Sequence, residues 1–127
     1  MQQTRFLIVE DDLESCKILN IVLADYQLTI VHTIASATPH FHNSHFDIFM
    51  LDNWLPDGSG IEFCREIRAR HPDAPIIFTS AAAQSHHVDE AKLAGATQYL
   101  VKPFDPFELK EIVKELLASK RRVESAS

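Results

Sequence analysis

The side chain with the clearest chemical potential is the carboxylate of Asp52, which ends the mostly apolar run 46–51. An apolar run of this length is typical of a strand that is buried on both faces, as in a parallel sheet with helices on either side. In such sheets the carboxyl ends of the strands hold the ligands and the chemistry. Asp52 is therefore the candidate reacting group.

Other polar residues also follow apolar runs. Glu10 and Asp11 follow the first run, Ser80 ends the fourth, and Lys102 follows the fifth. Because the carboxyl ends of parallel strands point the same way, we expect these side chains to share one pocket with Asp52. At an effective dielectric of about 20, two carboxylates 4 Å apart repel by roughly 4 kcal/mol before screening. The cluster therefore calls for a cation, and an all-oxygen set of ligands favours Mg²⁺.

The chemistry that suits this set is phosphoryl transfer to Asp52. Carboxylates are known covalent nucleophiles that form aspartyl phosphates. Lys102 would pair with a phosphate as a point charge, and Ser80 could donate a hydrogen bond to a phosphoryl oxygen. The reaction depends mainly on positioning and charge neutralisation, which these residue types supply.

The elements that must position these residues alternate between strand and helix along the chain. Runs of buried-strand character cover residues 5–10, 28–34, 46–52, 75–80 and 99–101. Helices are expected from residue 13 to about 26, from Ser59 or Gly60 to before Pro72, from 86 to 93 with Gly95 as its C-cap, and through Leu109 to Leu117. Pro39 predicts a short or irregular second helix within residues 35–45. The alternation predicts an α/β fold, a single doubly wound five-stranded parallel sheet with helices on both faces.

Composition narrows the class of protein. With 127 residues and 46% hydrophobic content we expect one domain, at residues 1–118, followed by a polar, frayed tail or linker at 119–127. No run is long enough for a membrane span, and the N-terminus does not resemble a signal peptide. Cys16 and Cys64 are interpreted as reduced core residues of a cytoplasmic protein. The net charge of −6 argues against broad nucleic-acid binding by this domain.

Four motifs, taken together and in order, resemble the receiver domain of two-component response regulators over about residues 4–118. These motifs are Val9-Glu10-Asp11-Asp12, Met50-Leu51-Asp52 with Leu55-Pro56-Asp57-Gly58, Phe78-Thr79-Ser80-Ala81, and Tyr99-Leu100-Val101-Lys102-Pro103-Phe104. The resemblance implies a flavodoxin-like sheet with its strands in the order 2-1-3-4-5. It also implies a cis peptide bond before Pro103.

The resemblance also implies residue roles. Asp52 would accept a phosphoryl group from a histidine kinase or a histidine phosphotransfer protein. The implied Mg²⁺ ligands are Glu10, Asp11, Asp52 and the backbone carbonyl of Trp54. Lys102 would pair with the phosphate, while Ser80 would be the switch hydroxyl and Tyr99 the switch aromatic. Such a domain is no enzyme beyond catalysing its own phosphorylation and dephosphorylation.

The family switch would act by population shift, changing the face formed by the fourth helix, fifth strand and fifth helix. The weakly apolar fourth helix is our candidate for the mobile element. The expected partners are the kinase or phosphotransfer protein and an output domain or protein target, with a homodimer left open. Neither membrane binding nor direct nucleic-acid binding by this domain is expected.

Several residues also have simpler interpretations. Asp12 is interpreted as a helix-entry acid and Asp57 as part of a turn. The seven histidines lack the spacing of metal ligands and are expected at the surface. Tyr99 is as compatible with simple packing as with a rotamer switch.

The sequence departs from the family pattern at two places. Trp54 is bulky where receivers more often have a small or polar side chain, and Ala82 is small two residues after Ser80. In the family these two positions tune how water reaches the acyl phosphate, and we hypothesise that Trp54 shields it and lengthens its lifetime. Thr97-Gln98 replaces an acidic pair that is common in the winged-helix transcription-factor branch, which puts that branch's dimer contacts in doubt.

Three other classes of function remain as alternatives. An unphosphorylated receiver-like interaction module would lack the intact pocket. A hydrolase with an aspartyl nucleophile commonly has a second acid where this chain has Trp54. A nucleotide-binding protein would need a glycine-rich loop after the first strand, where this chain is acidic.

Overall fold

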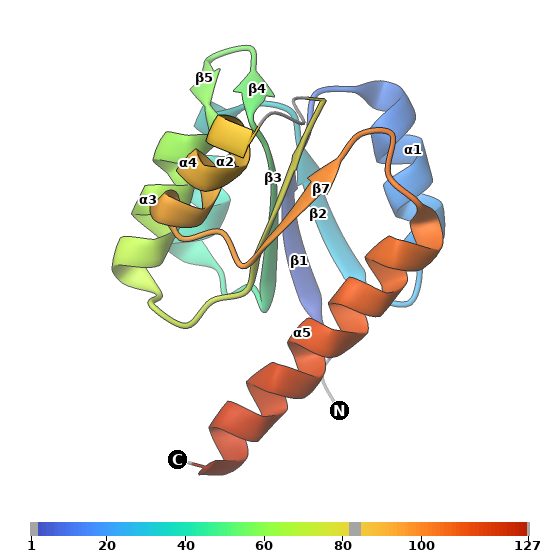
Figure 1. Ribbon diagram of the computed structural model, residues 1–127, viewed down its shortest axis with the longest axis vertical. Helices are drawn as coiled ribbons and strands as arrows, with labels where there is room; N and C mark the ends of the chain where they lie inside the picture. Colours follow the sequence, from blue (N-terminus) through green and yellow to red (C-terminus); the bar gives the residue numbers. More distant parts are fainter. Residues whose placement is uncertain (1–2, 82–84, 127) are drawn as a thin grey trace.

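The computed structural model describes residues 3–81 and 85–126 as three layers, with a parallel sheet between two layers of helices (Figure 1). The main sheet has the strand order β2-β1-β3-β6-β7, and all its pairings are parallel. Helices α1 and α5 lie on one face, while α2, α3 and α4 lie on the other (Figure 1). The elements are β1 (Arg5–Val9), α1 (Leu13–Val22), β2 (Gln27–Val31), α2 (Ile34–Asn43), β3 (Ile48–Asp52), β4 (Trp54–Leu55), β5 (Gly58–Ser59), α3 (Gly60–Arg70), β6 (Ile76–Ser80), α4 (Ser85–Ala94), β7 (Gln98–Val101) and α5 (Pro106–Ala126).

The central strand β3 is buried on both faces because its side chains alternate between two cores. Ile48 and Met50 pack in the core formed with α1 and α5, and Phe49 and Leu51 pack in the core formed with α2, α3 and α4. This period of two places successive side chains on opposite sides of the sheet. The five-stranded fold and its strand order are as the sequence analysis predicted; the short hairpin β4–β5 alone shifts the numbering.

The prediction of a short or irregular second helix is wrong, because α2 is a regular helix that includes Pro39. Its first backbone N–H groups are satisfied from another part of the chain: both carboxylate oxygens of Asp57 accept hydrogen bonds, from the N–H groups of Ile34 and Ala35, each at 2.9 Å. Thr33 caps the helix locally by accepting from the N–H of Ser36. This early start of α2 also explains why β2 ends at Val31 and not at Ile34 as expected.

The prediction of a frayed segment after residue 118 is wrong for residues 119–126, which continue helix α5 to Ala126. Lys120 ties this part of the helix to the body, since its Nζ lies 2.9 Å from Oδ1 of Asp47 in the turn before β3. The boundary proposed at residue 118 therefore falls inside a continuous helix. Figure 1 shows the last turns of α5 extending past the end of the sheet at which the N-terminus lies.

Two leucines on the helices of the fold are exposed. Leu13 begins α1 with 65% of its surface exposed, and Leu93 on α4 is 88% exposed. On α4 the buried side chains are Ala91 and Ala94, so Leu93 lies on the opposite, solvent side of that helix.

Among the described residues, no helix combines the length and the hydropathy needed to cross a membrane.

Candidate functional site

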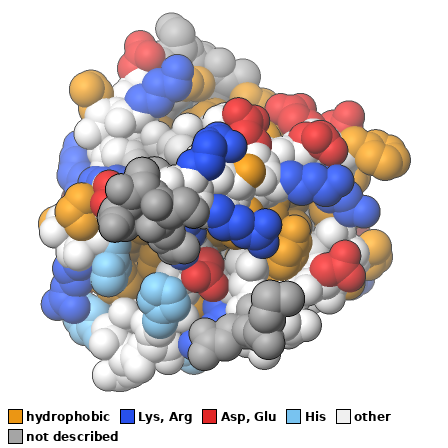
Figure 2. Space-filling view, turned by 90° about the horizontal axis from the view of Figure 1, so that it is seen from below, with side chains coloured by type: hydrophobic (Ala, Val, Ile, Leu, Met, Phe, Trp, Pro, Cys, Tyr) orange, Lys and Arg blue, Asp and Glu red, His pale blue; other side chains and the backbone are white. Residues whose placement is uncertain are grey.

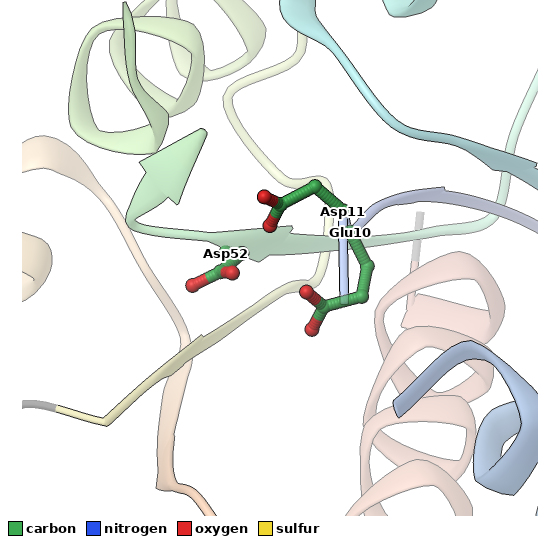
Figure 3. Close-up of side chains that lie close together, drawn as sticks. All are labelled: Glu10, Asp11 and Asp52. Carbon is green, nitrogen blue, oxygen red and sulfur yellow. The ribbon is translucent and has the colours of Figure 1, made fainter. Parts of the chain in front are cut away.

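The carboxyl ends of β1 and β3 bring three acidic side chains together. Val9 of β1 pairs with Leu51 of β3, so Glu10 and Asp11 follow one strand beside the end of the other, where Asp52 lies. One carboxylate oxygen from each of Glu10, Asp11 and Asp52 lies within 4.8 Å of the other two. Figure 3 shows the three carboxylates arranged around one space. With Lys102 they form what we call the acidic site.

Lys102 supplies the positive charge of the acidic site. Its Nζ lies 2.5 Å from Oε1 of Glu10 and 3.2 Å from Oδ2 of Asp52. The three side chains are largely buried, with 16%, 3% and 8% of their surface exposed for Lys102, Glu10 and Asp52. The backbone N–H of Lys102 donates to the carbonyl of Ser80 at 2.9 Å, which fixes the lysine to the end of β6.

The electrostatics of the site reflect this crowding of charges. The pKa of Glu10 is raised to about 7: burial is the main cause and the nearby charge of Asp52 adds to it, against the lowering effect of Lys102. Burial would lower the pKa of Lys102, but its contacts with Glu10 and Asp52 outweigh burial and raise it. Lys102 therefore remains charged, while Glu10 is poised to exchange its proton for another cation.

Gly60 lets the start of α3 approach the backbone of Asp52. A Cβ at this position would lie 2.1 Å from the carbonyl oxygen of Asp52 and 3.3 Å from Cζ of Phe78. The N–H of Gly60 donates to the carbonyl of Asn53 at 3.0 Å, and Ser59 caps the helix. Any larger residue would push against the residue that carries the candidate reactive group.

The remaining site candidates lie close by along the neighbouring strands. Ser80 is fully buried at the end of β6, one residue beyond the partner of Asp52 in the sheet. Its neighbour Thr79 donates its hydroxyl to the carbonyl of Leu51 at 3.4 Å. Tyr99 of β7 stacks on Phe78, with 5.8 Å between ring centroids and 18° between planes.

Trp54 begins β4, two residues after Asp52, and 59% of its surface is exposed. Its ring meets His87 of α4 edge to face, with 6.1 Å between centroids. The hairpin after the acidic site therefore touches the fourth helix through this aromatic pair. Ala82, the other position expected to affect water access, lies outside the described residues.

Two other expectations concern residues around the site. The Lys102–Pro103 peptide bond is cis, as predicted. Asp12 caps α1, where its carboxylate accepts from the N–H and the hydroxyl of Ser15, and this contact with the hydroxyl lowers the pKa of Asp12. Asp12 and Asp57 are thus helix-capping acids, and neither belongs to the group of Glu10, Asp11 and Asp52.

Two residues that support the site were not predicted from the sequence. Nδ1 of His32 lies 2.8 Å from the carbonyl oxygen of Glu10, and because a carbonyl only accepts, Nδ1 carries the proton and donates. Gly60 was noted only as a helix start. The pattern Gly58-Ser59-Gly60 is a signal of close approach between two backbone segments, whereas nothing near His32 in the sequence predicts its contact with Glu10.

The donor set fits a divalent cation that prefers oxygen ligands. It consists of carboxylates without histidine or cysteine, and its negative charge exceeds the single positive charge of Lys102. Mg²⁺ has this preference and usually retains several water ligands. Glu10, Asp11 and Asp52 are therefore the side chains that would hold it.

Comparison with known proteins identifies the family. The family model described as the response regulator receiver domain matches residues 6–114. A curated relative, the transcriptional regulatory protein ZraR of Klebsiella oxytoca, is 30% identical over 98% of this chain, which covers 28% of that protein. The chain spans between about a fifth and a half of the length of the curated relatives that it matches.

Solved structures agree with this assignment. A CheY-like receiver domain protein from Methanospirillum hungatei JF-1 superposes with a TM-score of 0.88 at 26% identity, covering 95% of this chain and 98% of that one. The BeF3-activated DrrB receiver domain gives a TM-score of 0.85 at 28% identity, covering 93% and 99%. The chain therefore belongs to the response regulator receiver domain family of two-component systems.

Proposed function

We propose that Asp52 accepts a phosphoryl group from a histidine kinase or histidine phosphotransfer protein, in a reaction that depends on Mg²⁺. The observation that carries the proposal is the contact of Lys102 with both Glu10 and Asp52 at the buried end of the sheet. In the transfer an Oδ atom of Asp52 forms a bond to phosphorus while the donor's P–N bond breaks, and the electron pair of that bond remains on the imidazole. The acidic site would catalyse only this transfer and the hydrolysis of its product.

The residues of the site divide the work. Glu10, Asp11, Asp52 and the backbone carbonyl of Trp54 would hold Mg²⁺, which when bound would offset the charge of the carboxylates and the phosphoryl oxygens. Lys102 would move its contact from the Asp52 carboxylate to a phosphoryl oxygen, because the new group carries more negative charge.

The proposed switch begins at Ser80 and ends on the face formed by α4, β7 and α5. Ser80 would donate its hydroxyl to the phosphoryl group, and Tyr99 would then turn. The stacking of Tyr99 on Phe78 favours a linked response, because Phe78 is in the same strand as Ser80 and lies close to the position of a Cβ on Gly60. An output domain, a protein target or a second copy of the chain would read the altered face.

Exposed apolar side chains beside the acidic site are consistent with a protein as phosphodonor. Leu13 at the start of α1 and Phe107 at the start of α5 are both largely exposed, and both helices begin at the end of the sheet that holds Asp52 (Figure 1). A donor protein that covers them would exclude water from the transfer.

The test is incubation with acetyl phosphate and Mg²⁺, followed by intact-mass measurement. The parent chain should gain the mass of one phosphoryl group, and Asp52→Asn should gain none. Asp57→Asn is the matched control, because Asp57 is an exposed acid in the next turn whose role is to cap α2; it should be phosphorylated like the parent. Equal labelling of Asp52→Asn and the parent would refute the assignment of Asp52.

A further inference from the structure

The end of the sheet opposite the acidic site contains a cavity that the proposed phosphotransfer does not use. It has a volume of about 920 Å³ and is bounded by the C-terminal ends of α2 and α3, the turn before β3, the start of β6, and α5 near Lys120. We call it the basal pocket. Its volume lies within the roughly 300–1,000 Å³ typical of small-molecule sites. Figure 2 views this end of the molecule and shows histidine side chains gathered beside hydrophobic ones.

The lining of the basal pocket is aromatic and apolar at its base. Phe41, Phe46, Phe49 and Leu116 all contribute to it. Phe41 is at the centre of a ring cluster, with Phe49 and His71 edge-on to it at centroid distances of 5.8 and 5.6 Å. A surface of this kind favours a flat, unsaturated ring as its occupant.

The charged groups at the rim of the pocket indicate which substituent a bound ring should have. Lys120 and His45 both contact Asp47, so that carboxylate is already satisfied. The guanidinium of Arg70 lies 5.6 Å from the centroid of Phe41, and among the described residues it forms no ion pair. Asp73, also at the rim, is the acid that opposes an incoming anion.

A metal ion is not the expected occupant. His42, His45 and His71 line the pocket, but the one candidate group of metal ligands in the described part of the chain is Glu10, Asp11 and Asp52 at the other end of the sheet. His42 contacts Glu66 and His45 contacts Asp47, so both imidazoles already have protein partners in place of a metal ion. Arg70, with its fork of donors held over a ring, suits a planar carboxylate.

We propose that the basal pocket binds a small aromatic carboxylate, with its ring against the phenylalanine base and its carboxylate on Arg70. The site is independent of the phosphoacceptor, since the two lie at opposite ends of the sheet.

The experiment uses the full chain labelled with ¹⁵N and two matched probes, 1-naphthoate and its neutral analogue 1-naphthamide. We expect 1-naphthoate to give saturable shifts of backbone amide signals within 41–47 and 70–75, and 1-naphthamide to bind about tenfold more weakly. Arg70→Gln should remove this preference, and Asp73→Asn should strengthen binding of 1-naphthoate. Both residues are exposed, so the variants should fold, which the same spectra check.

Three results would overturn the proposal. One is the absence of saturable shifts with 1-naphthoate in the folded parent. The second is shifts that centre on the acidic site. The third is equal preference for the carboxylate in Arg70→Gln and the parent. Loss of phosphorylation in Asp52→Asn leaves the expected shifts unchanged, so the two proposals fail separately.

Discussion

Replacing Gly60 by alanine sets two physical effects against each other. Gly60 is the first residue of α3, and alanine at an unstrained helical position would ordinarily stabilise a helix by up to about 1 kcal/mol. In this chain, however, the new Cβ would meet the carbonyl oxygen of Asp52 at 2.1 Å.

The size of the clash decides which effect is larger. Real Cβ atoms essentially never lie closer than 3.0 Å to a heavy atom outside their own and the adjoining residues, so the two backbone segments must separate by about 0.9 Å. The contact is with backbone and not with a flexible side-chain end, and overpacking of this kind costs about 1–3 kcal/mol. Because the displaced residue carries the proposed phosphoacceptor, a shift approaching 1 Å should also slow phosphorylation by up to about 100-fold.

The assay combines urea denaturation with the rate of phosphorylation by acetyl phosphate, followed by intact mass. Gly95→Ala is the control, since Gly95 has a φ of +110° that alanine tolerates poorly, but its neighbour is Arg68, away from the acidic site. Both variants should lose stability, and only Gly60→Ala should lose phosphorylation rate in its folded fraction. A Gly60→Ala protein that is as stable as the parent and reacts at the parental rate would refute the reasoning.

Three other predictions concern the acidic site, helix α5 and Trp54. Because the pKa of Glu10 is raised to about 7, mainly by burial, Mg²⁺ must compete with a proton below that pH. The affinity for Mg²⁺, measured by calorimetry, should therefore weaken about tenfold from pH 8 to pH 6. Glu10→Gln should remove this pH dependence, and a variant that retains the parental dependence would contradict the role of Glu10. Lys120→Ala should lower the free energy of unfolding by about 1 kcal/mol at pH 7, whereas Lys114→Ala, which breaks an exposed contact, should change it little. Burial alone would raise the pKa of Asp47, but its hydrogen bonds and Lys120 lower it. The stabilisation by the Lys120–Asp47 pair is therefore present above the ordinary carboxyl pKa and is lost as pH falls through the lower pKa of the folded state. In urea denaturation at low pH the effect of Lys120→Ala should shrink, and an effect independent of pH would count against the ion pair. If Trp54 shields the acyl phosphate, Trp54→Asn should speed its hydrolysis, measured by the decay of the phosphorylated mass, and an unchanged rate would dismiss the shielding role.

The parts of the fold that sequence predicted well are those determined by local pattern. The run that ends at Asp52 is apolar at consecutive positions, and only a strand covered on both faces buries all of them. Once the strands are parallel, their carboxyl ends must meet, so Glu10 and Lys102 approach Asp52 even though they are distant in sequence. The grouping of the site thus followed from topology and not from any single motif.

The parts that sequence could not predict depend on contacts between distant segments. Nothing near Pro39 shows that Asp57 will cap the helix that contains it. Likewise the part of α5 past residue 118 contacts the body of the domain through Lys120 and Asp47, which lie 73 residues apart in the chain. Local patterns specify which face of an element is apolar, but they do not specify which remote carboxylate caps a helix or pairs with its lysine.

The extension of α5 past the sheet makes this end of the domain a stiff arm. A helix turns by about 100° and advances about 1.5 Å with each residue. Inserting or deleting a single residue near Ala126 would therefore swing any module fused there to another side of the receiver, and a full rotation would return only after about 3.6 residues. A series of fusions that differ by one alanine at this point would sample orientations around the helix axis in steps of about 100°.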